Sequence, residues 1–135
     1  MVVNFIEKRA PRDLDGADIF AGHMQFTRTM EAAGYKCEAF DLKRSYEDNI
    51  LTKPGFERLL HIILRVRDWG IVLCGPPCSL WIFLSSNYHC RKKMAAEGDE
   101  TKKEVLQANI VVQNLIVLLV ICALRKAWVG WNLQN

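Results

Sequence analysis

Short apolar runs alternate with longer amphipathic segments along most of this chain. Four runs have the length and composition of buried strands, and a fifth, much shorter run has the same character. These five predicted strands cover residues 17–21, 36–40, 49–51, 70–74 and 128–133. Because the four longer runs are nearly all apolar, they indicate strands that are buried on both faces, as in a parallel sheet.

Two helices are predicted between the first strands. One covers residues 24–33 and is followed by Gly34, at the position where helices commonly end on a glycine. The other begins near Pro54, whose missing N–H is tolerated in the first turn of a helix, and continues to Asp68. Apolar side chains recur along one face of each segment, so both helices are expected to pack on the sheet.

A third, longer helix is predicted before the last strand. Thr101 and Glu104 form a capping-box pattern at its start, and Arg125 lies at its far end, where a cation complements the helix dipole. Its apolar part, residues 110–124, covers only 15 residues and includes a glutamine and an asparagine. A membrane-spanning helix needs about 20 apolar residues, so we expect a buried helix and no membrane association.

The alternation of strands and helices predicts an α/β fold. We expect a Rossmann-like parallel sheet of about five strands in a three-layer α/β/α arrangement. Residues 1–16 are expected to form a lead-in segment, and residues 17–135 a single domain. In such sheets ligands bind beyond the carboxyl ends of the strands, where the strand order reverses. The loops after the first, second and fourth predicted strands therefore form the candidate site.

Composition and charge change this picture only slightly. The 135 residues include 24% charged residues and carry a formal net charge of +3, which is typical of a globular domain and does not indicate a nucleic-acid binder by itself. The five cysteines show no spacing of a disulfide framework, which favours a reducing compartment. No continuous apolar segment like that of a secretory signal lies at the N-terminus, so we expect an intracellular location, in the cytoplasm or nucleus.

Three loops carry residues that are suited to binding or catalysis. Gly22 follows the first strand and leads into a helix, which suits a sharp turn and a close approach of the backbone to a ligand. Asp41 ends the second strand, where an acid can hydrogen-bond ribose hydroxyls. After the fourth strand, Pro76 and Pro77 fix the backbone before Cys78, a candidate nucleophile. Taken singly, each has an ordinary alternative: a turn glycine, a solvated aspartate and a buried loop cysteine.

Together these loops resemble the motifs of the cytosine-5 DNA methyltransferase family, over nearly the whole chain. Residues 18–22, Asp-Ile-Phe-Ala-Gly, are similar to the first motif of the family, and Asp41 falls on its ribose-binding acid. Asp48 is similar to the acid that contacts the adenine ring. Residues 75–78, Gly-Pro-Pro-Cys, look like the motif that carries the nucleophile, and residues 131–135 align with a Glu-Asn motif.

The resemblance implies an S-adenosylmethionine-dependent methyltransferase with nucleic acid as its partner. It implies that Cys78 adds to C6 of a cytosine that has been flipped out of the helix, where its reacting atoms become accessible. The same resemblance implies a set of residues around the cofactor. These are Asp18, Phe20, Ala21, Gly22, His23, Asp41, Asp48 and Pro76.

The chain departs from the family pattern at several positions. Met24 stands in place of the second glycine of the first motif, Ser79 in place of a glutamine, and Gln134 in place of the catalytic glutamate. The later motifs and the target-recognition region have no counterpart after the last predicted strand. We therefore expect a truncated, divergent methyltransferase with weak or incomplete activity, and a partner chain or oligomer that covers the exposed edge of the sheet.

Two alternatives remain open. The motifs favour an enzyme, but a catalytically inactive methyltransferase-like domain that binds a nucleoside ligand or a partner protein also fits these departures. A metal site could be built from Cys74, Cys78, His89 and Cys90 by residue type. These four residues lack the close paired spacing of structural zinc sites, so no metal is expected.

Overall fold

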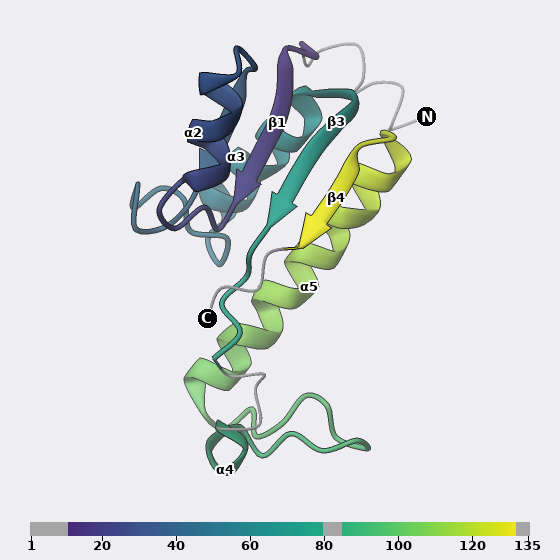
Figure 1. Cartoon of the computed structure of the whole chain (residues 1–135). Helices are drawn as coiled ribbons and strands as arrows, with labels where there is room; N and C mark the ends of the chain where they lie inside the picture. Colours follow the sequence, from purple (N-terminus) through teal and green to yellow (C-terminus); the bar gives the residue numbers. More distant parts are fainter. Residues whose placement is uncertain (1–10, 80–84, 132–135) are drawn as a thin grey trace.

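The computed structural model describes residues 11–79 and 85–131, which form a parallel sheet with helices packed against it (Figure 1). The elements in chain order are β1 (Leu14–Ile19), α2 (Gln25–Ala32), β2 (Cys37–Phe40), α3 (Lys53–Arg65), β3 (Val66–Cys74), α4 (Ser86–His89), α5 (Lys103–Leu124) and β4 (Trp128–Trp131). All strand pairs are parallel, in the order β2-β1-β3-β4. The predicted α/β class and parallel sheet are confirmed.

The sheet has four strands among the described residues, and the very short strand expected at residues 49–51 is not one of them. This segment is a turn in which the backbone N–H of Thr52 donates to the carbonyl of Asn49, at 3.0 Å. The hydroxyl of Thr52 then accepts the backbone N–H of Gly55 at 3.2 Å and caps α3. Because the chain enters a helix here, the residues just before it have no room to pair as a strand.

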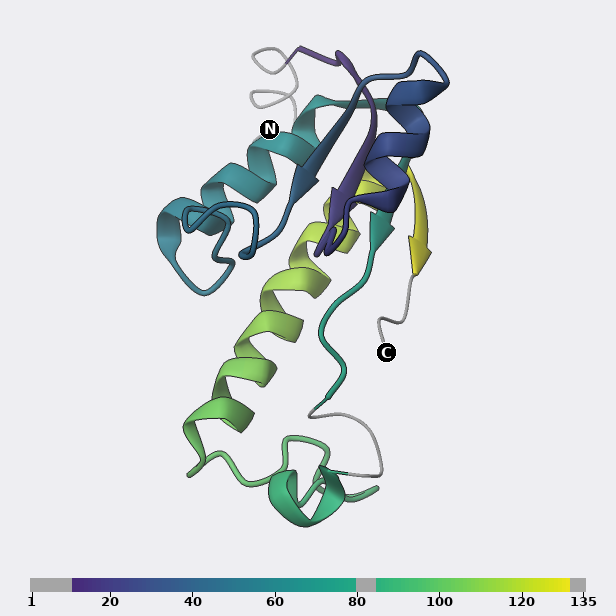
Figure 2. The same ribbon diagram turned by 60° about the vertical axis from the view of Figure 1, so that its left-hand side comes forward.

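The two faces of the sheet carry different side chains, because successive residues of a strand point to opposite sides. Gly16 and Asp18 of β1 face α2, and Asp18 is hydrogen-bonded to that helix. Ala17 and Ile19 point the other way, into a core that is shared with α3 and α5. Figure 2 shows α2 on one side of the sheet and α3 and α5 on the other. Each fully buried large aliphatic side chain in this core contributes about 1.5–3 kcal/mol.

The transition from α3 to β3 is more abrupt than the sequence predicts. The predicted helix extends to Asp68, but α3 ends at Arg65 and β3 begins at Val66. The pairing of β1 with β3 shifts register between Leu14 and Gly16 of β1. In the same region of β3, Trp69 has a φ of 63° and its ring lies 6.2 Å from that of Trp128.

The start of α5 differs from the capping box that was predicted. The N-cap is Lys102, without a side-chain cap, and the hydroxyl of Thr101 donates to Asp99 at 2.5 Å. The carboxylate of Glu104 accepts the hydroxyl of Tyr88 at 2.8 Å, so it does not reach back to the helix start. Glu104 therefore contacts the α4 segment instead of completing a capping box.

Helix α5 is longer and more exposed than a core helix is expected to be. It spans 22 residues and, by length and composition alone, could cross a membrane. Only 28% of its most apolar window is buried, which is less than expected for the buried helix that the sequence predicts. Its C-terminal part packs behind the sheet, and its N-terminal part runs past the sheet toward α4 in both views (Figures 1 and 2). Leu115, Leu118 and Cys122 are buried, so one side of α5 forms core while another faces outward.

The two ends of the predicted domain are described only in part. Strand β1 begins at Leu14, so the last part of the predicted lead-in segment, residues 1–16, already belongs to the sheet. The last predicted strand, residues 128–133, is present as β4, which ends at Trp131. Gln134, aligned with the glutamate motif, lies outside the described residues.

Candidate functional site

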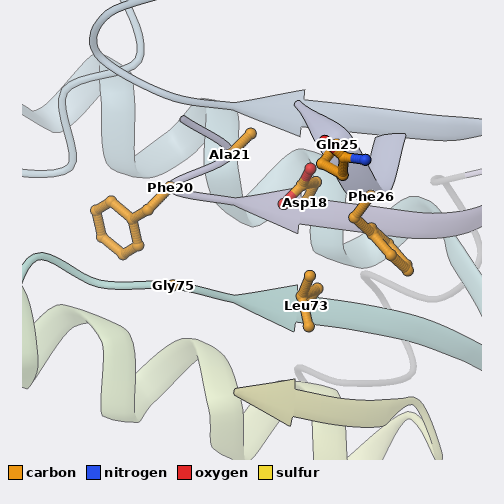
Figure 3. Close-up of a pocket in the computed structure, with 7 residues that line it drawn as sticks. All are labelled: Asp18, Phe20, Ala21, Gln25, Phe26, Leu73 and Gly75. Atoms are coloured by element: carbon orange, nitrogen blue, oxygen red, sulfur yellow. The ribbon is translucent and has the colours of Figure 1, made fainter. Parts of the chain in front are cut away.

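A small pocket lies at the carboxyl ends of β1 and β3, on the α2 side of the sheet (Figure 3). Strands β2 and β3 pair with opposite edges of β1, so the strand order reverses at this point. The pocket is lined by Asp18, Phe20, Ala21, Gln25, Phe26, Leu73 and Gly75. This is the position at which open parallel sheets bind ligands.

The turn between β1 and α2 has a constrained backbone. Phe20, Gly22 and Met24 have φ values of 59°, 52° and 57°, in a region that glycine adopts freely and other residues adopt at a cost of about 1 kcal/mol or more. The backbone N–H groups of Phe20 and Ala21 donate to the carbonyl of Phe40, at 2.7 and 3.3 Å. These hydrogen bonds fasten the turn to the end of β2.

Asp41 completes the connection between β2 and this turn. One oxygen of its carboxylate accepts the backbone N–H of Gly22 at 2.9 Å, and the other accepts the backbone N–H of Lys43 at 2.7 Å. The residue is buried. Because a carboxylate oxygen can accept two hydrogen bonds, each oxygen still has capacity for a hydroxyl group.

Asp18 links β1 to the first turn of α2 and borders the pocket. Its Oδ2 accepts the hydroxyl of Thr27 at 2.9 Å and the backbone N–H of Thr27 at 3.3 Å. Met24, the N-cap of α2, makes no side-chain cap bond, so Asp18 supplies the acceptor from the neighbouring strand. Burial raises the pKa of Asp18 above its ordinary value of 3.8. The hydrogen bonds from Thr27 lower this pKa and the charge of Asp41 raises it, and both effects are weaker than that of burial.

The other predicted cofactor residues lie in different surroundings. Ala21 is buried and Phe20 is half-buried, and both line the pocket. His23 is exposed in the turn, and Asp48 is buried in the loop after β2, where its carboxylate is 2.5 Å from Arg58 Nε. Pro76 is half-buried beyond the end of β3. Of these five, the pocket lining includes only Phe20 and Ala21 among the residues that the structure describes.

Cys78, the predicted nucleophile, is half-buried on the segment that leaves β3. It is not among the lining residues of this pocket, and residues 80–84, which follow it closely, lie outside the described part of the chain. The cysteines of the core are chemically different. Burial raises the pKa of Cys74 to about 12 and that of Cys122 to about 11, so both are protonated thiols at neutral pH.

The four residues of the alternative metal site are not gathered together. Cys74 is buried in the sheet core, whereas His89 and Cys90 lie at α4, which Figures 1 and 2 place away from the sheet. Within the described ranges no group of three or more histidine, cysteine, aspartate or glutamate side chains is arranged to hold a metal ion.

Four lining residues were not predicted from the sequence: Gln25, Phe26, Leu73 and Gly75. Gln25 and Phe26 open α2, Leu73 lies near the end of β3, and Gly75 follows that strand as the first residue of the Gly-Pro-Pro-Cys motif. Their signal was position rather than residue type. A residue in the first turn of the helix, or at the end of the central strand, borders the site when it lies on the face that points toward it.

The pocket is small, with a volume of about 30 Å³. This is room for a water molecule, whereas pockets for drug-sized ligands have about 300–1,000 Å³. The cavity as it stands therefore does not enclose a nucleoside.

Comparison with protein-family models, curated proteins and solved structures gave no match for this chain.

Proposed function

We propose that this chain is an S-adenosylmethionine-dependent methyltransferase-like domain that resembles the cytosine-5 DNA methyltransferases. The observation that carries the proposal is the hydrogen bond of 2.9 Å between the backbone N–H of Gly22 and the carboxylate of Asp41. It joins the glycine turn after β1 to the acid after β2, at the carboxyl edge of a parallel sheet. These are the two groups that would hold the nucleoside of the cofactor.

The chemistry of this pair suits a ribose. Each oxygen of the Asp41 carboxylate accepts one backbone N–H, from Gly22 or Lys43, and can accept one further hydrogen bond, which matches the donor capacity of adjacent hydroxyls. Neither Gly22 nor Asp41 is among the residues that line the pocket, whose lining includes Phe26 and Leu73 and so offers apolar surface. When bound, S-adenosylmethionine would supply a methyl group on a sulfonium centre. Asp18, Phe20 and Ala21, which line the pocket, are the chain's own residues that would hold the rest of the ligand.

Met24 gives a second argument for the resemblance. It stands where the family has its second glycine, and its φ of 57° is in the left-handed region that glycine adopts freely. The backbone of this turn thus has the shape that a glycine would favour, although the sequence carries a bulkier residue. The proposal is accordingly a divergent methyltransferase with weak or incomplete activity.

The catalytic part of the proposal rests on Cys78. As the nucleophile, its thiolate would add to C6 of a cytosine, and it would leave again once C5 had been methylated and had lost its proton. A base in a duplex must first leave the stack to reach such a group. Nucleic acid is therefore the proposed partner class, and the cytoplasm or nucleus the proposed location.

The finer description of the fold also belongs to this proposal. We propose a three-layer α/β/α architecture, because α2 packs on β1 and β2 while α3 and α5 pack together on the other face. On the α2 side, Ile71 of β3 and Trp128 of β4 are paired in register and exposed. A complete outer layer would cover these two residues as well.

Calorimetric titration of the folded chain with S-adenosylmethionine and S-adenosylhomocysteine, with NAD as the control, tests the proposal. We expect micromolar binding of the first two ligands and none of NAD. Asp41→Ala should weaken the binding about tenfold or more, since it removes hydrogen bonds to a charged group. Glu47→Ala, which removes an exposed acid from the same loop, is the matched control. Absence of binding to a folded chain would refute the cofactor assignment.

One observation favours a second candidate, a catalytically inactive domain that binds a partner protein. Ile116, Val120 and Leu124 form a row on α5 at intervals of four residues, and each is more than half exposed. At the sheet edge, Trp128 and Trp131 of β4 are exposed as well. Large apolar surfaces of this kind mark contacts with other proteins, and strand edges are templates for pairing with another chain.

The same α5 surface could be read as membrane-facing, and we propose protein contact instead. Asn114 donates a hydrogen bond to the carbonyl of Ile50 at 3.0 Å, and Arg125 donates one to the carbonyl of Leu64 at 2.6 Å. The first bond attaches α5 to the loop before α3, and the second attaches the C-terminal end of α5 to α3 itself. A helix fixed to the domain at two separate points is held as part of the fold rather than released to span a bilayer.

A further inference from the structure

The Asp48 side chain is completely buried and both of its oxygens are occupied by the protein. Oδ1 lies 2.5 Å from Nε of Arg58, and Oδ2 accepts the backbone N–H of Asp41 at 3.1 Å. A guanidinium nitrogen of Arg44 lies 3.8 Å from Oδ2. A buried carboxylate is stable only when it is paired and hydrogen-bonded, so these partners account for its presence inside the loop.

Arg58 reaches Asp48 from helix α3. Besides the contact with Asp48, its guanidinium lies 3.6 Å from the carboxylate of Glu38 on β2. The hydrogen bond to Asp48, and secondarily the surrounding carboxylates, raise the pKa of Arg58, so it stays protonated. The ion pair thus ties α3 to the loop that follows β2 at a defined geometry.

The contacts continue from Asp48 to the glycine turn. Asp48 holds the backbone N–H of Asp41, and the carboxylate of Asp41 in turn accepts the N–H of Gly22. A continuous series of contacts therefore runs from α3 to the β1–α2 turn, through Arg58, Asp48, Asp41 and Gly22. If Arg58 or Asp48 is replaced, the backbone N–H of Asp41 loses the contact that holds it in place.

We propose that Asp48 and Arg58 are positioning residues that hold the Asp41 carboxylate against the turn at Gly22, and that Asp48 does not contact the ligand. This replaces the role in adenine binding that the family resemblance implies for Asp48. Its consequence for ligand affinity rests on the proposed function, since it takes Asp41 as the ribose contact. The effect on Gly22 itself does not depend on any ligand.

The experiment uses the full chain labelled with ¹⁵N and follows hydrogen exchange at the Gly22 amide. Asp48→Asn, which keeps the shape but removes the charge, and Arg58→Ala should each accelerate this exchange about tenfold. Arg58→Lys should recover part of the protection, since it restores the charge without the planar fork. Asp41→Asn gives the reference effect of weakening the bond to Gly22 directly.

Arg65 provides the matched control on the same helix. It pairs with Asp13 at 2.7 Å and with Glu38 at 2.6 Å, and neither contact involves Asp48. Arg65→Ala should lower stability by removing ion pairs of the same kind, but it should leave Gly22 exchange, corrected for global stability, at the wild-type value. If Arg58→Ala and Arg65→Ala accelerate the hydrogen exchange of Gly22 equally, Arg58 contributes only to global stability and the proposal is overturned.

Titration with S-adenosylhomocysteine separates positioning from ligand contact. Asp48→Asn should weaken binding about tenfold together with the faster Gly22 exchange. Weaker binding with unchanged Gly22 exchange would mean that Asp48 contacts the ligand, and would overturn the positioning role. If the wild-type chain binds no S-adenosylhomocysteine, the proposed function fails, and the exchange data alone decide whether Asp48 and Arg58 position Asp41.

Discussion

Asp18 and Thr27 form a short bridge between strand β1 and helix α2 at the border of the pocket. The Asp18 carboxylate accepts both the hydroxyl of Thr27, at 2.9 Å, and its backbone N–H, at 3.3 Å. Thr27 is fully buried and lies in the first turn of the helix. The bridge therefore satisfies a helix N-terminus from outside the helix, and it orients α2 relative to the strand that leads into the site.

Removing this bridge should destabilise the domain in a graded way. We expect Asp18→Ala to lower the free energy of unfolding by about 1–2 kcal/mol, as for a lost helix cap. Thr27→Val should cost about 1 kcal/mol through the missing hydroxyl, whereas Thr27→Ser, which retains the hydroxyl, should cost less. Urea unfolding followed by circular dichroism measures all three, and equal losses for the valine and serine variants would contradict the assignment.

The stability of an Asp18→Asn variant should depend on pH in a predictable direction. Because burial raises the pKa of Asp18 above 3.8, the folded state favours the protonated acid. Its favourable contribution is therefore full below pH 3.8 and is lost as the pH rises through the raised folded value. Asparagine keeps an acceptor and does not ionise.

The variant should consequently gain stability relative to the wild type between pH 3.8 and neutral pH. Urea titrations at several pH values measure this difference. Glu47→Gln, which removes a carboxylate at an exposed position, is the control. A difference for Asp18→Asn that stays constant with pH would argue against a raised pKa.

Met24→Gly should improve ligand binding without loss of stability. The substitution relieves the left-handed conformation at φ 57°, which offsets the greater backbone entropy of glycine in the unfolded chain. It also removes a side chain next to the proposed site. We expect severalfold tighter binding of S-adenosylhomocysteine by calorimetry, and Met30→Gly inside α2 as a control should instead lower stability by about 1 kcal/mol. Unchanged affinity would remove Met24 from the site.

The five cysteines should separate into classes on alkylation near neutral pH. Cys74 and Cys122 are buried with raised pKa values of about 12 and 11, and burial also raises the pKa of Cys37 to about 11. These three should react slowly. If Cys78 is an activated nucleophile, it should react at least as fast as Cys90, which is exposed.

Iodoacetamide labelling followed by peptide mass spectrometry measures each rate separately. A Cys90→Ser variant confirms the assignment of the fast phase. Equal, slow reaction of Cys78 and the three slow thiols would exclude it as an activated nucleophile, because the thiolate is the reactive species.

The exposed row on α5 should govern self-association if the second candidate function is correct and the partner is another copy of the chain. Val120 lies in the middle of that row, between Ile116 and Leu124. Val120→Glu should shift the chain to the monomer mass of 15.5 kDa in light scattering after size exclusion. Glu57→Lys on α3, at another exposed position, is the control. A wild-type chain that is already monomeric at high concentration would leave only an unlike partner for this surface.

The sequence by itself determined the order and kind of the main elements. Apolar runs predicted all four observed strands, and Gly34, with a φ of 86°, follows α2 as expected for a helix end. The positions of Gly22 and Asp41 after two predicted strands also placed both in one candidate site, because parallel strands bring their carboxyl ends to one edge. Local pattern is informative here because each of these features depends on neighbours along the chain.

Only the tertiary structure decided the features that depend on distant partners. The family resemblance implies a ligand contact for Asp48, and the structure adds that Arg58 of α3 is hydrogen-bonded to its carboxylate. The predicted capping box at Thr101 does not form, since Glu104 accepts the hydroxyl of Tyr88 instead. The helix before β3 ends at Arg65, where Val66 pairs with Leu14. The sequence shows the charge and shape of each side chain. The residue with which that side chain pairs depends on how distant elements pack together, which no local pattern specifies.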